Sequence, residues 1–327
     1  MNWQSQTVLI TGAGGFIGSH LTEQCVALGA RTRALVRYNA ANAWGWLDTS
    51  LVKDAVEVIL GDLRDIESLR HAMQGVDIVY HLAALIAIPY SYQAPRSYVH
   101  TNVEGTLNVL QAARETGVRL VVHTSTSEVY GTARYVPIDE AHPLQGQSPY
   151  SASKIAADKM AEAFYCSFGV PVATIRPFNT FGPRQSTRAV IPTIITQALT
   201  QPVIRLGNLA PTRDLNYVAD TVAGFIRMAE CPAAIGQVIN IGSGQEISVG
   251  DLAQMIMELV GTVKPIDSDE QRVRPTDSEV ERLCADNRRA KVVLDWQPQC
   301  SLRDGLEQTI VWVQEHLAQF RPGAYTV

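Results

Sequence analysis

The 327-residue chain has few cysteines and lacks the patterns on which cysteine-dependent folds rely. Its five cysteines (Cys25, Cys166, Cys231, Cys284 and Cys300) are scattered and form no Cys-x-x-Cys pair. This argues against a disulfide framework and against a zinc site. We expect reduced packing residues in a cytoplasmic protein.

Long apolar runs and an excess of basic charge are also lacking. No stretch approaches the roughly 20 apolar residues of a membrane span. The first residues, Met1–Gln6, have no basic segment, so we expect no signal peptide. The net charge of −5 is opposite in sign to a typical nucleic-acid surface. We therefore expect neither a membrane nor a nucleic-acid partner.

What is present is a regular alternation of apolar runs and amphipathic segments. Near-continuous apolar runs are typical of parallel strands covered on both faces. The order strand, helix, strand predicts an α/β fold with a Rossmann-type doubly wound parallel sheet. We expect strands at 7–11, 32–37, 56–61, 77–83, 119–124 and 172–177, and helices at 15–28, 66–73, 99–116 and 150–168.

The pattern changes after Pro177, where Gly, Pro and Arg separate shorter elements. We expect a dinucleotide-binding domain at 1–178 and a smaller C-terminal substrate-binding lobe at 179–327. Two later stretches, 213–221 and 237–244, still resemble strands. The segment of about 212–244 is therefore expected to return to the sheet, which would interleave the two parts.

A glycine-rich loop follows the first strand. In "TGAGGFIG", Gly12, Gly15 and Gly18 have the GxxGxxG spacing, and Phe16 and Ile17 begin the next helix. A dinucleotide pyrophosphate needs a close backbone, free N–H groups and the positive end of a helix. We expect these five residues to bind the cofactor; the alternative is a tight strand–helix turn.

The ends of the second and third strands would meet the adenosine half of that cofactor. An acid usually grips the ribose of NAD here, but this chain has Arg37, with Arg33 nearby. Arginine can bind a 2′-phosphate, so NADP is allowed; the alternative is an exposed arginine beside NAD. Asp62 and the backbone of Leu63 are candidates for the adenine edge, whereas Asp65 is expected to cap a helix.

Tyr150 and Lys154 are four residues apart in "PYSASK", on one face of a predicted helix. A free tyrosine titrates near ~10, too high for a base at neutral pH. A nearby ammonium favours the phenolate, so Tyr150 could take a proton from a hydroxyl. Thr126 would donate a hydrogen bond to the same oxygen.

The strand at 119–124 ends in an unusual polar cluster, "TSTSEVYG", which includes Thr124, Ser127 and Glu128. Buried polar groups cost free energy unless they are paired, so this is either a turn or a site. His81, His123 and His142 lack metal-ligand spacing, so we expect packing or turn residues and no metal.

These motifs together resemble the extended short-chain dehydrogenase/reductase family over nearly the whole chain. The resemblance is carried by "TGAGGFIG", "HLAA", "YSASK" and "RPFNTFGPR". Within the family, "STSEVYG" is similar to nucleotide-sugar 4,6-dehydratases of the GDP-mannose dehydratase kind. Other stretches, such as "VRYNAANAWGWLDT" and "FNTFGPRQSTRAVIPTIITQAL", resemble bacterial GDP-N-acetylglucosamine 4,6-dehydratases, which begin legionaminic acid synthesis.

The resemblance implies a reaction in which C4 of the sugar is oxidised, water leaves across C5–C6 and hydride returns to C6. Glu128 would remove the C5 proton, and Ser127 would help to hold the leaving hydroxyl. Because Ser127 stands where glucose dehydratases have an aspartate, Glu128 would serve as both base and acid. The alternative for Glu128 is a helix or turn cap.

The resemblance also implies further contacts. Many relatives have a glutamine where this chain has Leu85, so a polar contact at that position is in doubt. Each arginine among the expected contacts (Arg184, Arg213 and Arg274) could equally be a surface ion-pair partner. Cofactor contacts are expected from Leu82, Ala83, Ala84, Thr124 and Pro177, and nucleotide-sugar contacts from Ser91, Asn179, Arg184, Arg213 and Arg274.

Several alternatives stay open. A UDP-uronic acid decarboxylase is one alternative, because such enzymes also carry a "TSEVYG" strand end. A C4 epimerase is another, although it needs no carboxylate at position 128. A non-catalytic sensor is the third, but it would be expected to lose part of the set Tyr150, Lys154 and Thr126. The helices at 99–116 and 150–168 are rich in small and apolar residues. They could form a homodimer contact or simply be buried within the subunit.

Overall fold

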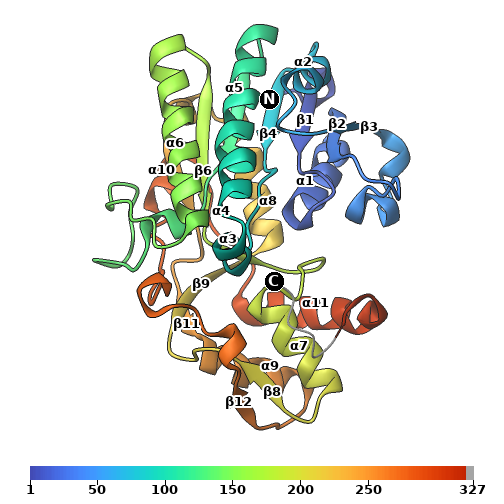
Figure 1. The fold of residues 1–327 in the computed structure, drawn as a ribbon. Helices are drawn as coiled ribbons and strands as arrows, with labels where there is room; N and C mark the ends of the chain where they lie inside the picture. Colours follow the sequence, from blue (N-terminus) through green and yellow to red (C-terminus); the bar gives the residue numbers. More distant parts are fainter. Residues whose placement is uncertain (322–327) are drawn as a thin grey trace.

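A seven-stranded parallel sheet forms the centre of the larger part of the molecule (Figure 1). The computed structural model describes residues 1–321. The strand order β10-β6-β5-β4-β1-β2-β3 is that of a doubly wound Rossmann-type sheet, which confirms the predicted fold class. The strands are β1 (Thr7–Thr11), β2 (Arg31–Arg37), β3 (Val56–Gly61), β4 (Ile78–His81), β5 (Leu120–Thr124), β6 (Val172–Pro177) and β10 (Val238–Ile241).

Helices cover both faces of this sheet, as continuous apolar strands require. Val8 and Ile10 of β1 belong to the core beneath one helix layer, whereas Leu9 between them belongs to the core of the opposite layer. The first layer contains α1 (Phe16–Ala27) and α8 (Val218–Glu230). The second contains α2 (Ile66–Met73), α5 (Gly105–Thr116) and α6 (Pro149–Phe168).

The helix predicted at 99–116 is not uniform. It starts as a π-helical turn, Val99–Glu104, after the short helices α3 (Ile88–Gln93) and α4 (Pro95–Tyr98). The wider turn carries Asn102, whose side chain bonds both the N–H (2.8 Å) and the carbonyl oxygen (2.9 Å) of Leu85. This contact holds the loop that follows β4.

The smaller part lies at the carboxyl ends of the central strands (Figure 1). It contains a three-stranded sheet in the order β11-β9-β7 and a two-stranded sheet, β12-β8. Its helices and strands are α7 (Val190–Thr200), α9 (Val249–Val260), α11 (Leu302–Glu315), β7 (Asn179–Phe181), β8 (Ile204–Leu206), β9 (Thr212–Tyr217), β11 (Glu246–Ser248) and β12 (Ile266–Ser268); α10 (Arg288–Leu294) contacts α8 and β10.

The expected return of residues 212–244 to the main sheet is correct only for β10. β9 pairs with β7 and β11 instead, and the residues that follow it form α8. β9 carries the buried polar residues Asp214 and Asn216, and a buried carboxylate such as that of Asp214 needs hydrogen-bond partners. Asp214 finds them in the backbone N–H groups of Ser243, Gly244 and Ala285. The domain boundary at residue 178 stays a prediction.

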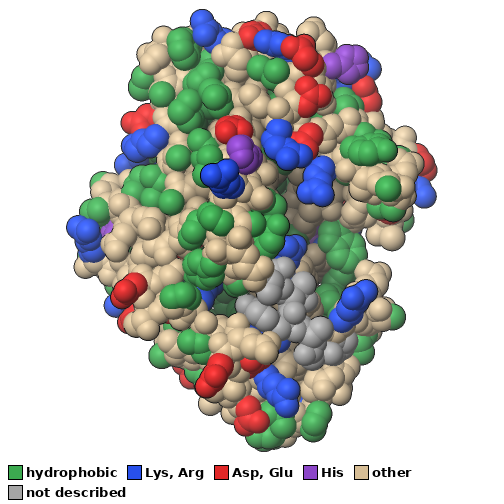
Figure 2. Space-filling model, in the orientation of Figure 1, with side chains coloured by type: hydrophobic (Ala, Val, Ile, Leu, Met, Phe, Trp, Pro, Cys, Tyr) green, Lys and Arg blue, Asp and Glu red, His purple; other side chains and the backbone are tan. Residues whose placement is uncertain are grey.

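The surface carries charges of both signs, and the cysteines differ in their exposure. On the face drawn in Figure 2, basic and acidic side chains are interspersed. Among the described residues, no helix combines the length and hydrophobicity needed to cross a bilayer. Cys25 and Cys284 are buried, but Cys166 is exposed, so its expected packing role is wrong.

Candidate active site

The glycine loop packs closely against the end of β4. Gly12 has φ +73°, and a Cβ there would lie 2.9 Å from the Cα of Ala83. A Cβ on Gly18 would lie 2.1 Å from the carbonyl oxygen of Gly12, so α1 can begin here only with glycine. Gly15, in contrast, is exposed.

The start of α1 fits a dinucleotide pyrophosphate. Within the described chain, no side chain caps this helix and its first turn contains no acid. The first N–H groups, including those of Phe16 and Ile17, have no partner one turn earlier within the helix. Together with the helix dipole they favour an anion. The residues expected to hold the cofactor phosphates therefore suit that group.

A second loop, which sequence reasoning missed, packs on the glycine loop. The N–H of Trp46 donates to the carbonyl oxygen of Gly14 (3.0 Å), and a Cβ on Gly14 would meet the carbonyl oxygen of Trp44 at 2.2 Å. The Trp46 ring also packs edge-on against Trp312 of α11, with centroids 5.4 Å apart. This loop therefore joins the phosphate loop to the smaller lobe.

The basic residues on β2 have different environments. Arg37 is exposed at the end of β2, opposite Gly61 in the sheet. Arg33 is not available to a ligand in the same way, because its guanidinium pairs with Glu57 (3.0 Å) and donates to the carbonyl oxygens of Ala72 and Gln74.

The residues after β3 are already engaged by the protein. Asp62 pairs with Arg64 at 2.6 Å, and hydrogen bonds from Arg64 lower the pKa of the Asp62 carboxyl. The Leu63 carbonyl oxygen accepts from Asn108 (2.9 Å). Asp65 caps α2 by accepting from the N–H of Glu67, as predicted.

Tyr150 and Lys154 lie on the first two turns of α6, whose N-terminus is held by a Ser148–Ser151 capping box. The Lys154 ammonium donates to the carbonyl oxygen of Thr124 at the end of β5 (2.6 Å). Burial lowers the pKa of Lys154 to about 8, and the charge of Asp158 opposes this shift. Burial raises the pKa of Tyr150, while a hydrogen bond with Thr126 lowers it.

Glu128 lies beside this pair, in the short 3-10 helix η5 (Ser127–Tyr130). The cap of η5 is Thr126, whose hydroxyl accepts from the N–H of Glu128 (3.3 Å), so the capping role proposed for Glu128 is wrong. Glu128 and Ser127 are both buried. Burial raises the pKa of Tyr150 and lowers the pKa of Arg213. The Glu128 charge acts on both groups, adding to the first shift and opposing the second, which places the carboxylate near both. No described residue hydrogen-bonds this carboxylate.

Two of the expected substrate arginines come together. Arg213 and Arg274 both pair with Glu279, at 3.2 and 3.5 Å. Arg184 is separate: it has φ +72°, pairs with Glu23 of α1 (2.8 Å) and donates to Ser19. Its partners thus lie on α1, the helix that follows the glycine loop.

The remaining expected contacts have different surroundings. Thr124 and Asn179 each keep a buried side-chain oxygen without a partner among the described residues, which suits ligand binding. Ser91 is fully buried and donates to the carbonyl oxygen of Ile88 (2.6 Å). Leu82, Ala83 and Ala84 follow β4, and Pro177 ends β6.

The histidines are packing residues, as expected. His81 bonds the hydroxyls of Thr11 and Thr106, and His123 bonds Asp158. His142 bonds the backbone of Arg134 and Pro143. Within residues 1–321, no group of three or more His, Cys, Asp or Glu side chains could hold a metal.

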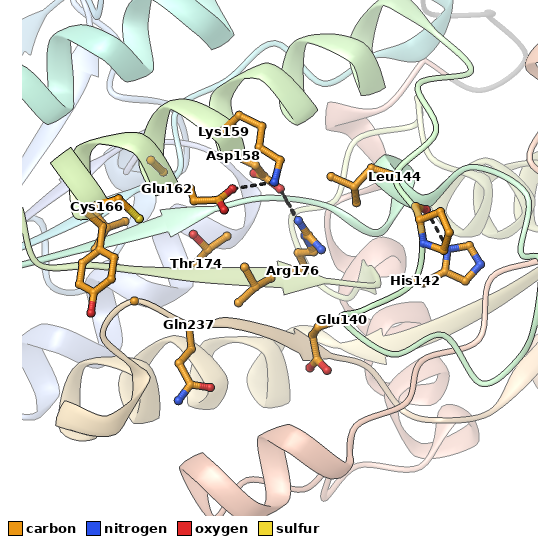
Figure 3. A pocket seen from close by; sticks show the side chains of 16 residues that line it. Glu140, His142, Leu144, Asp158, Lys159, Glu162, Cys166, Thr174, Arg176 and Gln237 are labelled. Atoms are coloured by element: carbon orange, nitrogen blue, oxygen red, sulfur yellow. Dashed lines mark hydrogen bonds and ion pairs between the residues drawn. The ribbon is translucent and has the colours of Figure 1, made fainter.

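A cavity of about 480 Å³ lies elsewhere, between α6, β6 and β10 (Figure 3). Glu140, Lys159 and Gln237 line it, and the ion pair of Asp158 and Arg176 lies at its wall. Neither Tyr150 nor Glu128 lines this cavity, so it is not the candidate active site.

Comparison with known proteins identifies the class. The family described as GDP-mannose 4,6 dehydratase matches residues 9–309, and the chain belongs to this family of nucleotide-sugar dehydratases and epimerases in the extended short-chain dehydrogenase/reductase group.

Individual relatives have three different activities. A UDP-glucose 4-epimerase of Mycolicibacterium smegmatis is 34% identical (92% of this chain, 96% of the relative). A UDP-glucuronic acid decarboxylase 1 of Xenopus tropicalis is 32% identical (95% and 72%). DesIV, a dTDP-glucose 4,6-dehydratase of Streptomyces venezuelae solved with NAD and TYD bound, superposes with a TM-score of 0.89 at 29% identity (97% and 99%). Membership of this family therefore does not determine which of the three reactions the chain catalyses.

Proposed function

We propose that the protein is a nucleotide-sugar 4,6-dehydratase that converts an NDP-hexose to the 4-keto-6-deoxy sugar. The observation that carries this proposal is the buried Glu128 carboxylate, which lies near Tyr150 without a hydrogen-bond partner among the described residues. A carboxylate that lies beside Tyr150 and makes no structural hydrogen bond is available to exchange a proton with a bound sugar, so a catalytic role accounts for its presence.

Tyr150, Thr126 and Lys154 would act at the C4 hydroxyl. The Tyr150 oxygen takes the hydroxyl proton, Thr126 orients that oxygen, and the Lys154 ammonium favours the phenolate. A nicotinamide dinucleotide bound at the glycine loop would supply hydride acceptance at C4 and hydride return at C6. Burial of Tyr150 excludes water from the proton transfer.

Glu128 would then act at C5 and C6. The C4 ketone acidifies the C5 proton, and the Glu128 carboxylate is the base that removes it. The protonated Glu128 can next donate to the departing C6 hydroxyl, which Ser127 helps to hold. One residue therefore performs both proton transfers of the elimination, and no second acid is required at position 127. When hydride returns to C6, C5 takes a proton that comes from the solvent, so the product formed in D₂O carries one deuterium.

The nucleotide would bind in the smaller lobe. Arg213 and Arg274 share Glu279 and together present forked donors suited to a diphosphate. The unpartnered Asn179 oxygen is available to a sugar hydroxyl. The sequence resemblance supports GDP- or UDP-N-acetylglucosamine as the substrate, and the GDP form would place the protein in legionaminic acid biosynthesis.

The cofactor and assembly are also proposals. NAD is supported by DesIV, and NADP by Arg37 at the end of β2. A homodimer through α5 and α6 is supported by exposed apolar side chains on and just before these helices: Val99, Leu107, Tyr165 and Phe168. The protein is proposed to act in the cytoplasm.

Decarboxylation of a UDP-uronic acid is the second candidate, because the Arg213 guanidinium lies near Glu128 and could bind a C6 carboxylate. C4 epimerisation, in contrast, requires no carboxylate at position 128, so it does not explain the presence of Glu128.

The test is mass spectrometry of reactions in D₂O with GDP-N-acetylglucosamine, UDP-N-acetylglucosamine and UDP-glucuronate in separate tubes. The proposal predicts loss of one water with one deuterium retained, from one of the two amino sugars. Loss of carbon dioxide from the glucuronate alone would overturn it in favour of the decarboxylase. A product of unchanged mass with inverted C4 would identify an epimerase.

A further inference from the structure

Asp158 is a buried carboxylate on the helix that carries Tyr150 and Lys154. It follows Lys154 by four residues and Tyr150 by eight, so the three side chains share one face of α6. Its relative exposure is 5%. A buried charge of this kind is tolerated only when it is paired and hydrogen-bonded.

The partners of Asp158 come from two neighbouring strands. The Ser125 hydroxyl donates to it at 2.6 Å and the ring of His123, on β5, approaches it at 3.0 Å. Arg176, on β6, donates through two nitrogens at 2.8 and 3.2 Å. Figure 3 shows the Asp158–Arg176 ion pair at the wall of the cavity behind α6.

Ser125 makes this network relevant to the candidate site. It lies between Thr124, whose carbonyl oxygen accepts from Lys154, and Thr126, which hydrogen-bonds Tyr150. The Asp158–Ser125 bond therefore ties the helix that bears Tyr150 and Lys154 to the strand end that bears Thr126.

Arg176 extends the same network to the other side of Glu128. Its guanidinium donates to the hydroxyl of Tyr130 (3.0 Å), and that hydroxyl donates to Asn240 (2.7 Å). Tyr130 is the last residue of η5. Glu128 is thus held between two residues, Ser125 and Tyr130, that are both anchored to the Asp158–Arg176 pair.

We propose that Asp158 is a positioning residue for the candidate catalytic groups: with Arg176 it fixes the end of β5 and η5 relative to α6, and its carboxylate is the negative charge next to Lys154 on the same face of α6. Its role in turnover rests on the proposed function, whereas its effect on Lys154 exists without substrate.

The electrostatic part follows from the surroundings of Lys154. The Lys154 ammonium contacts the carbonyl oxygen of Thr124. The other titratable or cationic groups of this network lie on the neighbouring strands: His81 on β4, His123 on β5 and Arg176 on β6. Burial lowers the pKa of both histidines, so they remain neutral. Asp158 is therefore the negative charge that offsets the burial of Lys154. Replacing it with a neutral amide lowers the pKa of Lys154 further.

The test compares Asp158→Asn with Ser125→Ala and with Asp220→Asn. Asp220 is an equally buried carboxylate on α8 that accepts from the N–H of Cys300, away from the Asp158 network. For each purified holoenzyme, the pH dependence of Lys154 labelling by an amine reagent is followed by mass spectrometry, together with kcat, KM and the melting temperature.

We expect Asp158→Asn to move the Lys154 labelling curve to lower pH and to reduce kcat by roughly 10- to 100-fold, with KM within a few-fold of the original. Ser125→Ala should reduce kcat less and leave the labelling curve in place. Asp220→Asn should change only the melting temperature. A labelling curve and kcat unchanged in Asp158→Asn would overturn the proposal.

Two further outcomes separate the possible failures. If Asp158→Asn does not fold, Ser125→Ala decides: kcat equal to that of the unmodified protein contradicts positioning, and a selective fall in kcat supports it. If the unmodified protein turns over no nucleotide sugar, the proposed function fails. The labelling curves of Asp158→Asn and Asp220→Asn then still show whether Asp158 controls Lys154.

Discussion

The Lys154 ammonium donates a 2.6 Å hydrogen bond to the carbonyl oxygen of Thr124, the last residue of β5. This contact joins the helix that carries Tyr150 to the strand end that leads to Thr126 and Glu128. The ammonium is buried, and burial lowers the pKa of Lys154 to about 8. A group that titrates there makes both activity and stability depend on pH.

The first prediction concerns that dependence. In the proposed mechanism the Lys154 ammonium stabilises the Tyr150 phenolate, so kcat should fall as Lys154 loses its proton, when pH rises through about 8. Stability should change in the opposite direction: the folded pKa is depressed below the value of 10.5 for an unburied lysine, so between these pH values the unfolded chain binds more protons. This site therefore contributes stability that increases from about pH 8 to 10.5.

Rate profiles and urea unfolding across this pH range measure both effects. Lys159→Met is the matched control, because Lys159 is an exposed residue of the same helix. It should leave both profiles in place. A kcat that stays level well above pH 8 would show that Lys154 does not supply the required charge.

The second prediction concerns the glycine loop. Gly18→Ala would bring a methyl group to 2.1 Å from the Gly12 carbonyl oxygen, so the loop or α1 must move. We expect a loss of about 1–3 kcal/mol in the free energy of unfolding and a lower content of bound cofactor.

Gly250→Ala is the control, since the nearest atom to its added Cβ is 3.6 Å away, which is an ordinary contact. It should stabilise the protein by up to about 1 kcal/mol. Denaturant titration and the absorbance of released cofactor measure the two quantities. Normal cofactor content in Gly18→Ala would contradict the binding role of this loop.

The third prediction separates the two arginines of β2. Arg37→Ala should weaken binding of NADP by roughly tenfold or more and leave NAD binding nearly unchanged, because only a 2′-phosphate needs the exposed guanidinium. Arg33→Ala should destabilise the fold, since Arg33 pairs with Glu57 and with two backbone carbonyls, but should not change the preference between the cofactors.

Fluorescence titration of cofactor-free protein gives both dissociation constants for each variant. If the ratio of NADP to NAD affinity is the same in Arg37→Ala as in the original protein, Arg37 is a surface residue and plays no part in cofactor choice.

The parts of the site that could be predicted from sequence have local signals. Gly12, Gly15 and Gly18 follow a strand and open a helix, and Tyr150 and Lys154 have helical spacing. The six expected strands and four helices could also be predicted from local signals, because periodicity is a feature of neighbouring residues.

The parts that could not be predicted depend on contacts between distant segments. Arg184 was expected near the sugar and pyrophosphate, but its partner Glu23 is 161 positions earlier, and no local pattern links them. The contact of Trp46 with Gly14 and the support of Leu85 by Asn102 are likewise tertiary. The sequence could not show that β9 lies outside the main sheet, because a short strand has a similar residue pattern in either sheet.

The most direct test of the central claim is a single turnover of Glu128→Gln with the nucleotide sugar that the unmodified protein dehydrates, in D₂O. Glu230→Gln is the control, because Glu230 pairs with Trp3 and Arg227, far from the proposed chemistry. We expect Glu128→Gln to accumulate reduced nicotinamide and to release essentially no water from the substrate, whereas the control forms the dehydrated, monodeuterated product. Formation of that product by Glu128→Gln at the original rate would contradict the assignment of Glu128 as the base that drives elimination.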